Sequence, residues 1–196
     1  MTRILICGGV LFLASLGVLG GMTVRAAEQS PAAAGAQKAD PTLETLRAKA
    51  QERMALDRSL LSNDEFRDLE SLYQSANRDL RSPEAKAKLQ EVVRKYPQSN
   101  RAGCAILYLA QMSSGTEREE YLKSAIASYG NSWYGDGVQV GALARAQLAV
   151  HYANTGRTEE AQRLAEELRS QFPAAVDHSG VRLTAGLQSL KPQRVP

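Results

Sequence analysis

Apolar residues recur every three to four positions from Thr42 onward, and this spacing predicts amphipathic α-helices. Prolines, glycines and capping hydroxyls interrupt the pattern and divide it into consecutive segments. No segment alternates strictly enough for a β-strand. The pattern therefore predicts an all-α fold of antiparallel helix pairs. The expected helices cover residues 42–61, 63–76, 82–96, 102–112, 116–130, 136–155 and 158–172, and a last amphipathic helix uses Val181, Leu183, Leu187 and Leu190 and stops at Lys191-Pro192.

Short motifs place several of the expected helix starts. Ser82-Pro83-Glu84 combines a hydroxyl cap, a proline in the first turn and an acid near the positive end of the helix dipole. Thr116 with Glu119, and Asp136 with Gln139, have the spacing of a capping box. We therefore expect helices to begin at these three places.

Part of the pattern is repeated. Ala85 and Pro97 stand 12 residues apart, as do Ala161 and Pro173, and the two alanines are separated by 76 residues. Each stretch has the features of the second helix of a pair that ends before a proline. The interval leaves room for one more helix pair between the two copies.

The later copy resembles a tetratricopeptide repeat, a family of paired helices in which small residues, an aromatic residue and a turn glycine hold fixed positions. Ala149 and Ala161 would let the two helices approach closely, and Gly156 would permit a left-handed turn. Arg145 departs from the pattern, because the family often has tryptophan there. The resemblance implies a short α-solenoid of three helix pairs with a C-terminal capping helix. The matching residues are Leu148, Ala149, Tyr152, Gly156, Ala161 and Pro173.

The spacing of the two copies also locates an insertion. The family period is about 34 residues, so two periods would span roughly 68, fewer than the 76 observed. The excess fits best at residues 131–138, between the middle and last pairs. Trp133, Tyr134 and Asp136 in this segment could anchor a peptide or glycan on a loop. Alternatively, Trp133 packs into the gap made by the insertion, and Asp136-Gly137 supplies turn and cap chemistry.

Repeat arrays of this kind are binding scaffolds. The resemblance implies an extracytoplasmic protein-protein interaction scaffold that holds a protein or peptide segment on a concave face, which the first helix of each pair forms. The alternative is an oligomeric spacer of the cell envelope in which the helix over 42–61 self-associates, although Arg53 and Asp57 interrupt its apolar seam. The candidate partner-binding residues are Trp133, Tyr134, Asp136, Arg145, Gln147 and His151.

Residues that could support catalysis or cofactor binding are few. Three consecutive residues such as Asp177-His178-Ser179 cannot converge on one another as the members of a catalytic triad. No sequence motif pairs His151 with a nucleophile or an orienting acid. No histidine or cysteine spacing matches a zinc site, and no glycine loop has the pattern that binds phosphates. We therefore expect no enzyme, no cofactor and no metal site. Cys104 is expected to be a small buried core residue.

The first 26 residues have the features of an export signal. Arg3 precedes an apolar run, and Val24 and Ala26 are small residues before the expected cleavage point. In the alternative, residues 4–24 remain as a membrane anchor and provide the expected membrane contact. Either reading places the rest of the chain in the periplasm or cell envelope. Residues 27–41 are expected to form a disordered linker ahead of a helical domain over 42–191.

The charge of the chain argues against a nucleic-acid partner. The formal net charge is +3, but Arg3 and Arg25 belong to the export signal, and its removal leaves a net charge of +1. A near-neutral domain has little electrostatic attraction for a polyanion. The expected partner is a protein or peptide, and the sequence leaves its identity and the oligomeric state open.

Overall fold

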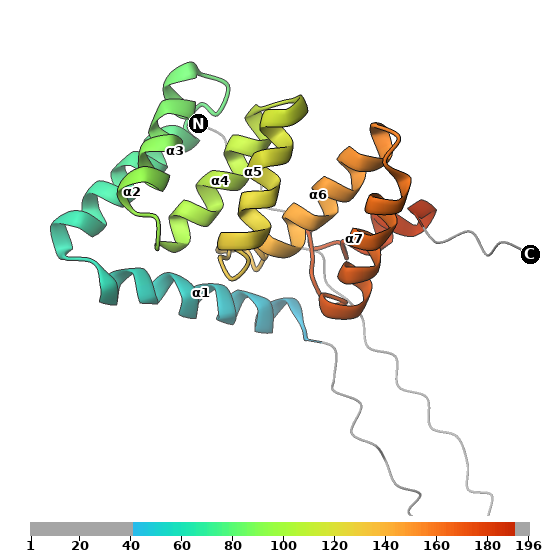
Figure 1. Cartoon of the computed structure of the whole chain (residues 1–196). Coiled ribbons are helices and arrows are strands. Elements are labelled where there is room, and N and C mark those ends of the chain that lie inside the picture. Colours follow the sequence, from blue (N-terminus) through green and yellow to red (C-terminus); the bar gives the residue numbers. More distant parts are fainter. Residues whose placement is uncertain (1–40, 191–196) are drawn as a thin grey trace, which may run out of the picture. The chain divides into compact units, whose positions relative to one another are not determined.

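The computed structural model describes residues 41–190, with side chains up to Gln188. The expected export signal, and the expected linker up to residue 40, lie outside the described residues. The described part is all-helical, as the apolar pattern predicts (Figure 1). Its elements are α1 (Leu43–Leu60), α2 (Asn63–Asn77), α3 (Pro83–Lys95), α4 (Asn100–Met112), α5 (Gly115–Ser128), α6 (Val140–Asn154), α7 (Thr158–Gln171) and the 3₁₀ helix η1 (Ala185–Leu190).

Consecutive helices pack in pairs. α2 packs on α3, α4 on α5 and α6 on α7, and a short turn joins the members of each pair, which run in opposite directions (Figure 1). Each pair also packs on the next, through α3 with α4 and through α5 with α6. The first helices touch in order, α2 with α4 and α4 with α6, and α1 contacts both α2 and α4.

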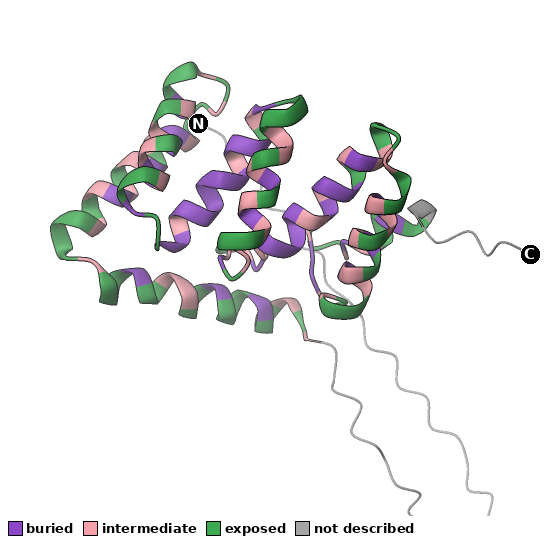
Figure 2. Ribbon diagram, viewed as in Figure 1, coloured by how far each residue is buried: buried purple, intermediate pink, exposed green. Residues whose placement is uncertain are grey.

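The helices α4 and α6 form the centre of the core. Figure 2 shows them mostly buried, whereas α2, α3 and α7 each bury one face and expose the other. Ala149 on α6 and Ala161 on α7 are fully buried, which fits the close approach that small residues permit. Cys104 on α4 is also fully buried, as the sequence predicts.

Serine side chains cap the starts of α2, α3 and α4. Ser62 forms a complete capping box with Glu65. Ser82 caps α3 ahead of Pro83, as predicted, and the hydroxyl of Ser99 accepts a hydrogen bond at the start of α4. These caps satisfy main-chain N–H groups that have no partner inside their own helix.

The two capping boxes expected from the sequence, Thr116 with Glu119 and Asp136 with Gln139, do not form. Helix α5 begins at Gly115, ahead of Thr116, and α6 begins at Val140 with no side-chain cap. Asp136 therefore lies outside α6, and the expected start of that helix is wrong by several residues. The carboxylates of Glu119 and Asp136 instead bond to side chains of other elements.

The connection between α5 and α6 is longer than the one between α3 and α4, and it falls where the sequence places the insertion. Residues 132–140 form a tight turn that we call the first hairpin loop. The N–H of Tyr134 donates to the carbonyl of Val138 (2.9 Å), and that of Val140 donates to Ser132 (2.9 Å). The N–H of Gly137 donates back to Tyr134 at 3.0 Å, and Gly137 has a φ of +96°.

The same turn recurs 43 positions later, in residues 175–183, which we call the second hairpin loop. Asp177 donates to Val181 (2.9 Å), Gly180 to Asp177 (2.9 Å) and Leu183 to Ala175 (3.0 Å), through main-chain atoms equivalent to those of the first loop. Gly180, like its counterpart, has a positive φ, of +78°. Two hairpin loops with one hydrogen-bonding pattern thus follow α5 and α7.

This second hairpin loop corrects the expectation of a C-terminal amphipathic helix from Val181. The carboxylate of Asp177 accepts the N–H groups of Ser179 and Val181, and Gly180 closes the turn, so the chain reverses there. Val181 is 53% exposed. Only the 3₁₀ helix η1 follows, in which Leu187 is buried; the side chain of Leu190 lies outside the described residues.

Helix α1 packs on the first hairpin loop. Leu46 is buried beside Gly137, where an added Cβ would lie 3.1 Å from the Leu46 Cβ and 3.1 Å from the Arg47 main-chain nitrogen. Met54 lies near Gly135, and its Cε would be 3.7 Å from a Cβ added at Gly135. A side chain at Gly137 would therefore push α1 away from the loop, whereas a Cβ at Gly135 would meet Met54 at ordinary van der Waals distance.

Asn100, at the start of α4, joins three elements. Its N–H donates to both carboxylate oxygens of Asp57 on α1, at 2.8 and 2.9 Å. Its side chain donates to the carbonyl of Trp133 (2.8 Å) and accepts the N–H of Trp133 (2.7 Å). Asn100 is fully buried and Asp57 is 3% exposed, so these bonds are screened little by water.

Comparing the stabilities of Gly137→Ala and Gly156→Ala distinguishes the cost of backbone strain from the cost of disturbing the packing of α1. Both glycines have positive φ, but a Cβ at Gly156 would meet nothing within 4 Å. We expect Gly156→Ala to lower the free energy of unfolding by about 1 kcal/mol and Gly137→Ala by roughly 1–2 kcal/mol more. Urea unfolding measures both. Equal losses would contradict the packing of α1 on the first hairpin loop.

Candidate functional site

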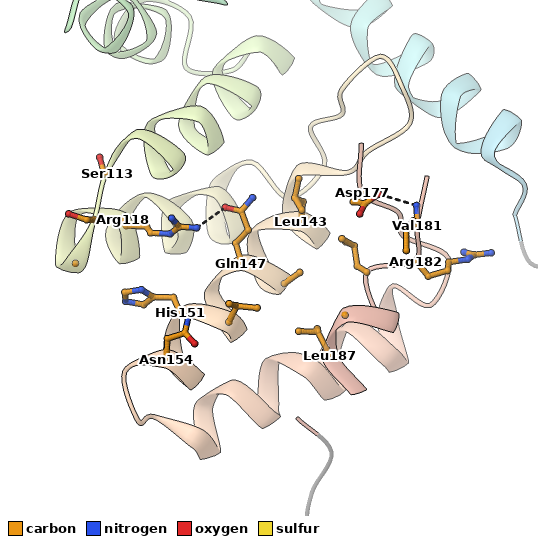
Figure 3. Close-up of a pocket in the computed structure, with 16 residues that line it drawn as sticks. Ser113, Arg118, Leu143, Gln147, His151, Asn154, Asp177, Val181, Arg182 and Leu187 are labelled. Atoms are coloured by element: carbon orange, nitrogen blue, oxygen red, sulfur yellow. Dashed lines mark hydrogen bonds between the residues drawn. The ribbon is translucent and has the colours of Figure 1, made fainter. Parts of the chain in front are cut away.

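A groove of about 590 Å³ opens beside α6 (Figure 3). Its floor is the α6 face that carries Leu143, Ala146, Gln147 and Val150. These residues share a face because positions three and four apart in a helix lie above one another. Leu143 and Ala146 are buried and Val150 is exposed, so the floor is mainly apolar.

Two remote segments form the walls of the groove. One wall is the turn between α4 and α5 and the first turn of α5, from Ser113 to Arg118. The other runs from Asp177 in the second hairpin loop to Leu187 in η1. Figure 3 shows Arg118 reaching across to Gln147, where its Nη2 donates to the side-chain oxygen at 3.5 Å.

Charged side chains stand on both walls of the groove. Arg118 and Arg182 lie on opposite walls, and Asp177 is the acid that lines the groove. The Asp177 carboxylate accepts two N–H groups of its own turn. Arg118 makes no ion pair with a carboxylate in the described part of the chain. The groove is therefore suited to a partner with apolar side chains and a negative charge.

Two of the residues predicted from the sequence, Gln147 and His151, line the groove. Arg145 does not. Its Nε lies 3.1 Å from a Glu167 oxygen on α7, and its guanidinium lies 4.9 Å from the centre of the Phe172 ring. Residues two apart in a helix point to nearly opposite sides, so Arg145 cannot share a face with Gln147.

The predicted loop residues also lie away from the groove. Tyr134 is buried, and its hydroxyl donates to the carbonyl of Cys104 at 3.1 Å. Its burial raises its pKa well above the usual value. The main chain of Trp133 is bound by Asn100. Asp136 Oδ2 lies 2.7 Å from Nδ1 of His178, so this acid links the two hairpin loops.

A row of aromatic rings connects the first hairpin loop with the core. The ring centres of Tyr73 and Tyr108 lie 6.2 Å apart, those of Tyr108 and Tyr134 5.6 Å, and those of Tyr134 and His178 4.8 Å. The thiol of Cys104 is buried near these rings, and burial raises its pKa to about 12. Cys104 is therefore protonated at neutral pH and acts as a core residue.

A charged cluster surrounds Glu119 and includes His151, which lines the groove. The Glu119 carboxylate lies 2.6 Å from Lys123, 2.8 Å from Arg157 and 3.7 Å from the His151 ring. The hydroxyl of Tyr152 also donates to it, at 3.1 Å. Hydrogen bonds from Lys123 first, and then from Arg157, lower the pKa of Glu119 to about 2. The cluster ties α5 to α6 and to the start of α7.

Part of the groove could be predicted from the sequence. Helical periodicity along α6 places Gln147, Val150, His151 and Asn154 on one side, so the same spacing that selects the polar residues also predicts Val150 as part of the site. Arg118 and Leu187 line the same groove from other segments. Local sequence patterns do not predict that Arg118 and Leu187 lie near α6. The position of Leu187 depends on the chain reversal in the second hairpin loop, which precedes η1.

Comparisons with protein-family models, with curated proteins and with solved structures found no match. Between residues 41 and 190, no helix combines the length and hydropathy needed to cross a membrane. The same stretch contains no group of three or more histidine, cysteine, aspartate or glutamate side chains placed to hold a metal ion.

Glu119→Gln tests the charged cluster. The folded-state pKa of Glu119 is about 2, below its ordinary value of 4.5, so its ionisation stabilises the fold above pH 4.5. We expect the variant to lose about 1–3 kcal/mol of unfolding free energy at pH 7. The difference from wild type should shrink as the pH falls from 4.5 toward 2.

Urea unfolding across this pH range measures the effect. Glu166→Gln is the control, because Glu166 pairs with Arg169 but is 65% exposed, and its loss should change stability little. A difference between wild type and Glu119→Gln that is as large at pH 3 as at pH 7 would contradict the assignment.

Proposed function

We propose that this chain is a scaffold for protein-protein interaction, built from three tetratricopeptide-like helix pairs, α2–α3, α4–α5 and α6–α7. Three features support the repeat assignment: the successive packing of the pairs, the contacts between their first helices, and the buried Ala149 and Ala161 at the α6–α7 contact. In such arrays the first helices line the binding face. The export signal expected in residues 1–26 supports a location in the periplasm or cell envelope.

The observation that carries this proposal is the groove on α6. It combines an apolar floor, polar residues at the rim and an open side, which are the features of a surface that takes up a protein segment. Val150, on its floor, is 46% exposed. The exposed apolar surface thus lies on the first helix of the last pair, where a repeat scaffold would bind its partner.

A non-catalytic role is part of the proposal. His151 is the basic side chain of the groove with the chemistry of a general base. Its ionisable neighbour is Glu119, and within residues 41–190 no hydroxyl or thiol hydrogen-bonds to its ring. A nucleophile paired with a base is therefore not assembled there.

Site-specific photo-crosslinking tests the scaffold. A benzophenone amino acid at position 150, in the full chain expressed in its native host, should give discrete crosslinked products of higher mass. The same amino acid at Arg163, exposed on α7 and outside the groove, is the control. Products that are absent at position 150, or identical at both positions, would contradict the proposal. Mass spectrometry identifies the partner.

A second candidate function is the oligomeric spacer with α1 at the contact. The observation in its favour is the exposure of Leu56 (48%) and Leu60 (68%), one turn apart on α1. If α1 self-associates, replacing both leucines by glutamate should convert an oligomer into a monomer in sedimentation velocity. An unchanged sedimentation coefficient would exclude the spacer and leave the scaffold proposal intact.

A further inference from the structure

We propose that the groove beside α6 binds an α-helix of a partner protein, in the place that the first helix of a fourth pair would occupy. This inference rests on the proposed function and specifies the kind of partner. Its structural basis is the repetition of a whole unit, a helix pair followed by a hairpin loop.

The two hairpin loops define the repeated unit. The first loop leads from α5 into α6, and the second leads from α7 into η1 with the same main-chain hydrogen bonds. A shift of 43 positions maps Val140, the first residue of α6, onto Leu183, just before η1. The segment Leu183–Leu187 therefore lies where a further first helix would begin. Leu183 and Leu187 are both buried, as core residues of such a helix would be.

The element at this position is much shorter than its counterpart. Helix α6 has 15 residues and η1 has six. At about 1.5 Å per residue for an α-helix, α6 spans roughly 22 Å. At about 2.0 Å per residue for a 3₁₀ helix, η1 spans at most about 12 Å, and it is kinked at Leu187 (φ −109°, ψ 16°). About two helical turns beside the second half of α6 therefore stay uncovered by η1.

The uncovered surface has the character of a helix contact. Four large apolar residues with more than a third of their surface exposed occur in the described part of the chain, and two of them, Val150 and Val181, line this groove. Leu143 and Leu187 extend the apolar surface inward. Residues of this type and spacing match the apolar stripe of an amphipathic helix.

The charge of the rim adds a condition on the partner. Arg118 stands beside the second half of α6, bonded to the neutral side chain of Gln147, and has no carboxylate partner between residues 41 and 190. An acidic side chain on the flank of the bound helix would pair with it. The partner segment is therefore an amphipathic helix with two apolar residues one turn apart and an acid on its flank.

A designed peptide tests the proposal directly. The probe is a fluorescein-labelled, alanine-based helix of about 16 residues, long enough to be helical alone, with two leucines one turn apart and a glutamate one turn beyond them. Fluorescence anisotropy measures its affinity for the protein purified from cells that express the full chain. Two further peptides carry lysine in place of the glutamate, or two central prolines that abolish the helix.

We expect the glutamate peptide to bind, and Val150→Glu to weaken its binding at least about tenfold by placing a charge on the apolar floor. Arg118→Glu should weaken the glutamate peptide and strengthen the lysine peptide, a reversal that loss of folding cannot produce. Arg163→Glu is the matched control, because it makes the same charge change as Arg118→Glu at an exposed position of α7 outside the groove, and it should leave the affinity unchanged.

Three outcomes would overturn the proposal. Equal binding of the proline peptide would show that the groove takes an extended segment, and crosslinking at position 150 would still support the scaffold. Binding that appears only after deletion of residues 191–196 would make the chain's own terminus the occupant. No binding to either form of the protein would exclude a helical partner, whatever the crosslinking result.

Discussion

The arrangement of the other elements depends on one contact, in which the buried carboxylate of Asp57 on α1 binds the first N–H group of α4. A helix start offers unpaired N–H groups and the positive end of the helix dipole, and a carboxylate satisfies both. The main-chain N–H of Asn100 donates to this carboxylate, and the Asn100 side chain hydrogen-bonds to the main chain of Trp133. One residue thereby fixes α1, α4 and the first hairpin loop together. A charge in the apolar seam of α1, which would weaken a coiled coil, is here a specific structural contact.

The hydrophobic pattern was sufficient to predict the helices and their order, because helix formation in this chain follows local periodicity and local stop signals. The close packing of Ala149 and Ala161 could be predicted from their places in the repeat pattern, and the long connection between α5 and α6 from the 76-residue interval between the two copies. The C-terminal region could not. Leu183 and Leu187 have helical spacing, but Asp177 and Gly180 form a turn between them and α7, and η1 is all that follows. A turn with two satisfied N–H groups outweighs a weak amphipathic pattern.

In the candidate site, too, local spacing predicts some of the residues, whereas the position of others depends on contacts that are distant in the sequence. Gln147 and His151 share a face of α6 and could be selected from spacing alone, and the same spacing excludes Arg145. Tyr134 illustrates the opposite case. An aromatic residue in a glycine-containing loop suggests exposure, yet its ring is buried between Tyr108 and His178. Those contacts join residues about 26 and 44 positions away, and only the completed fold reveals them, since chain reversals decide which segments meet.

The placement of α1 has a mechanical consequence. Its contacts lie in sequence order, from Leu46 at Gly137, through Met54 at Gly135, to Asp57 at Asn100. A pull on the chain ahead of Leu43 would load these contacts one after another, as in peeling, and would reach the buried carboxylate last. The apolar contacts would yield first because each is small. The charge-assisted bonds at Asn100 would then arrest the peeling before force reached the helix pairs.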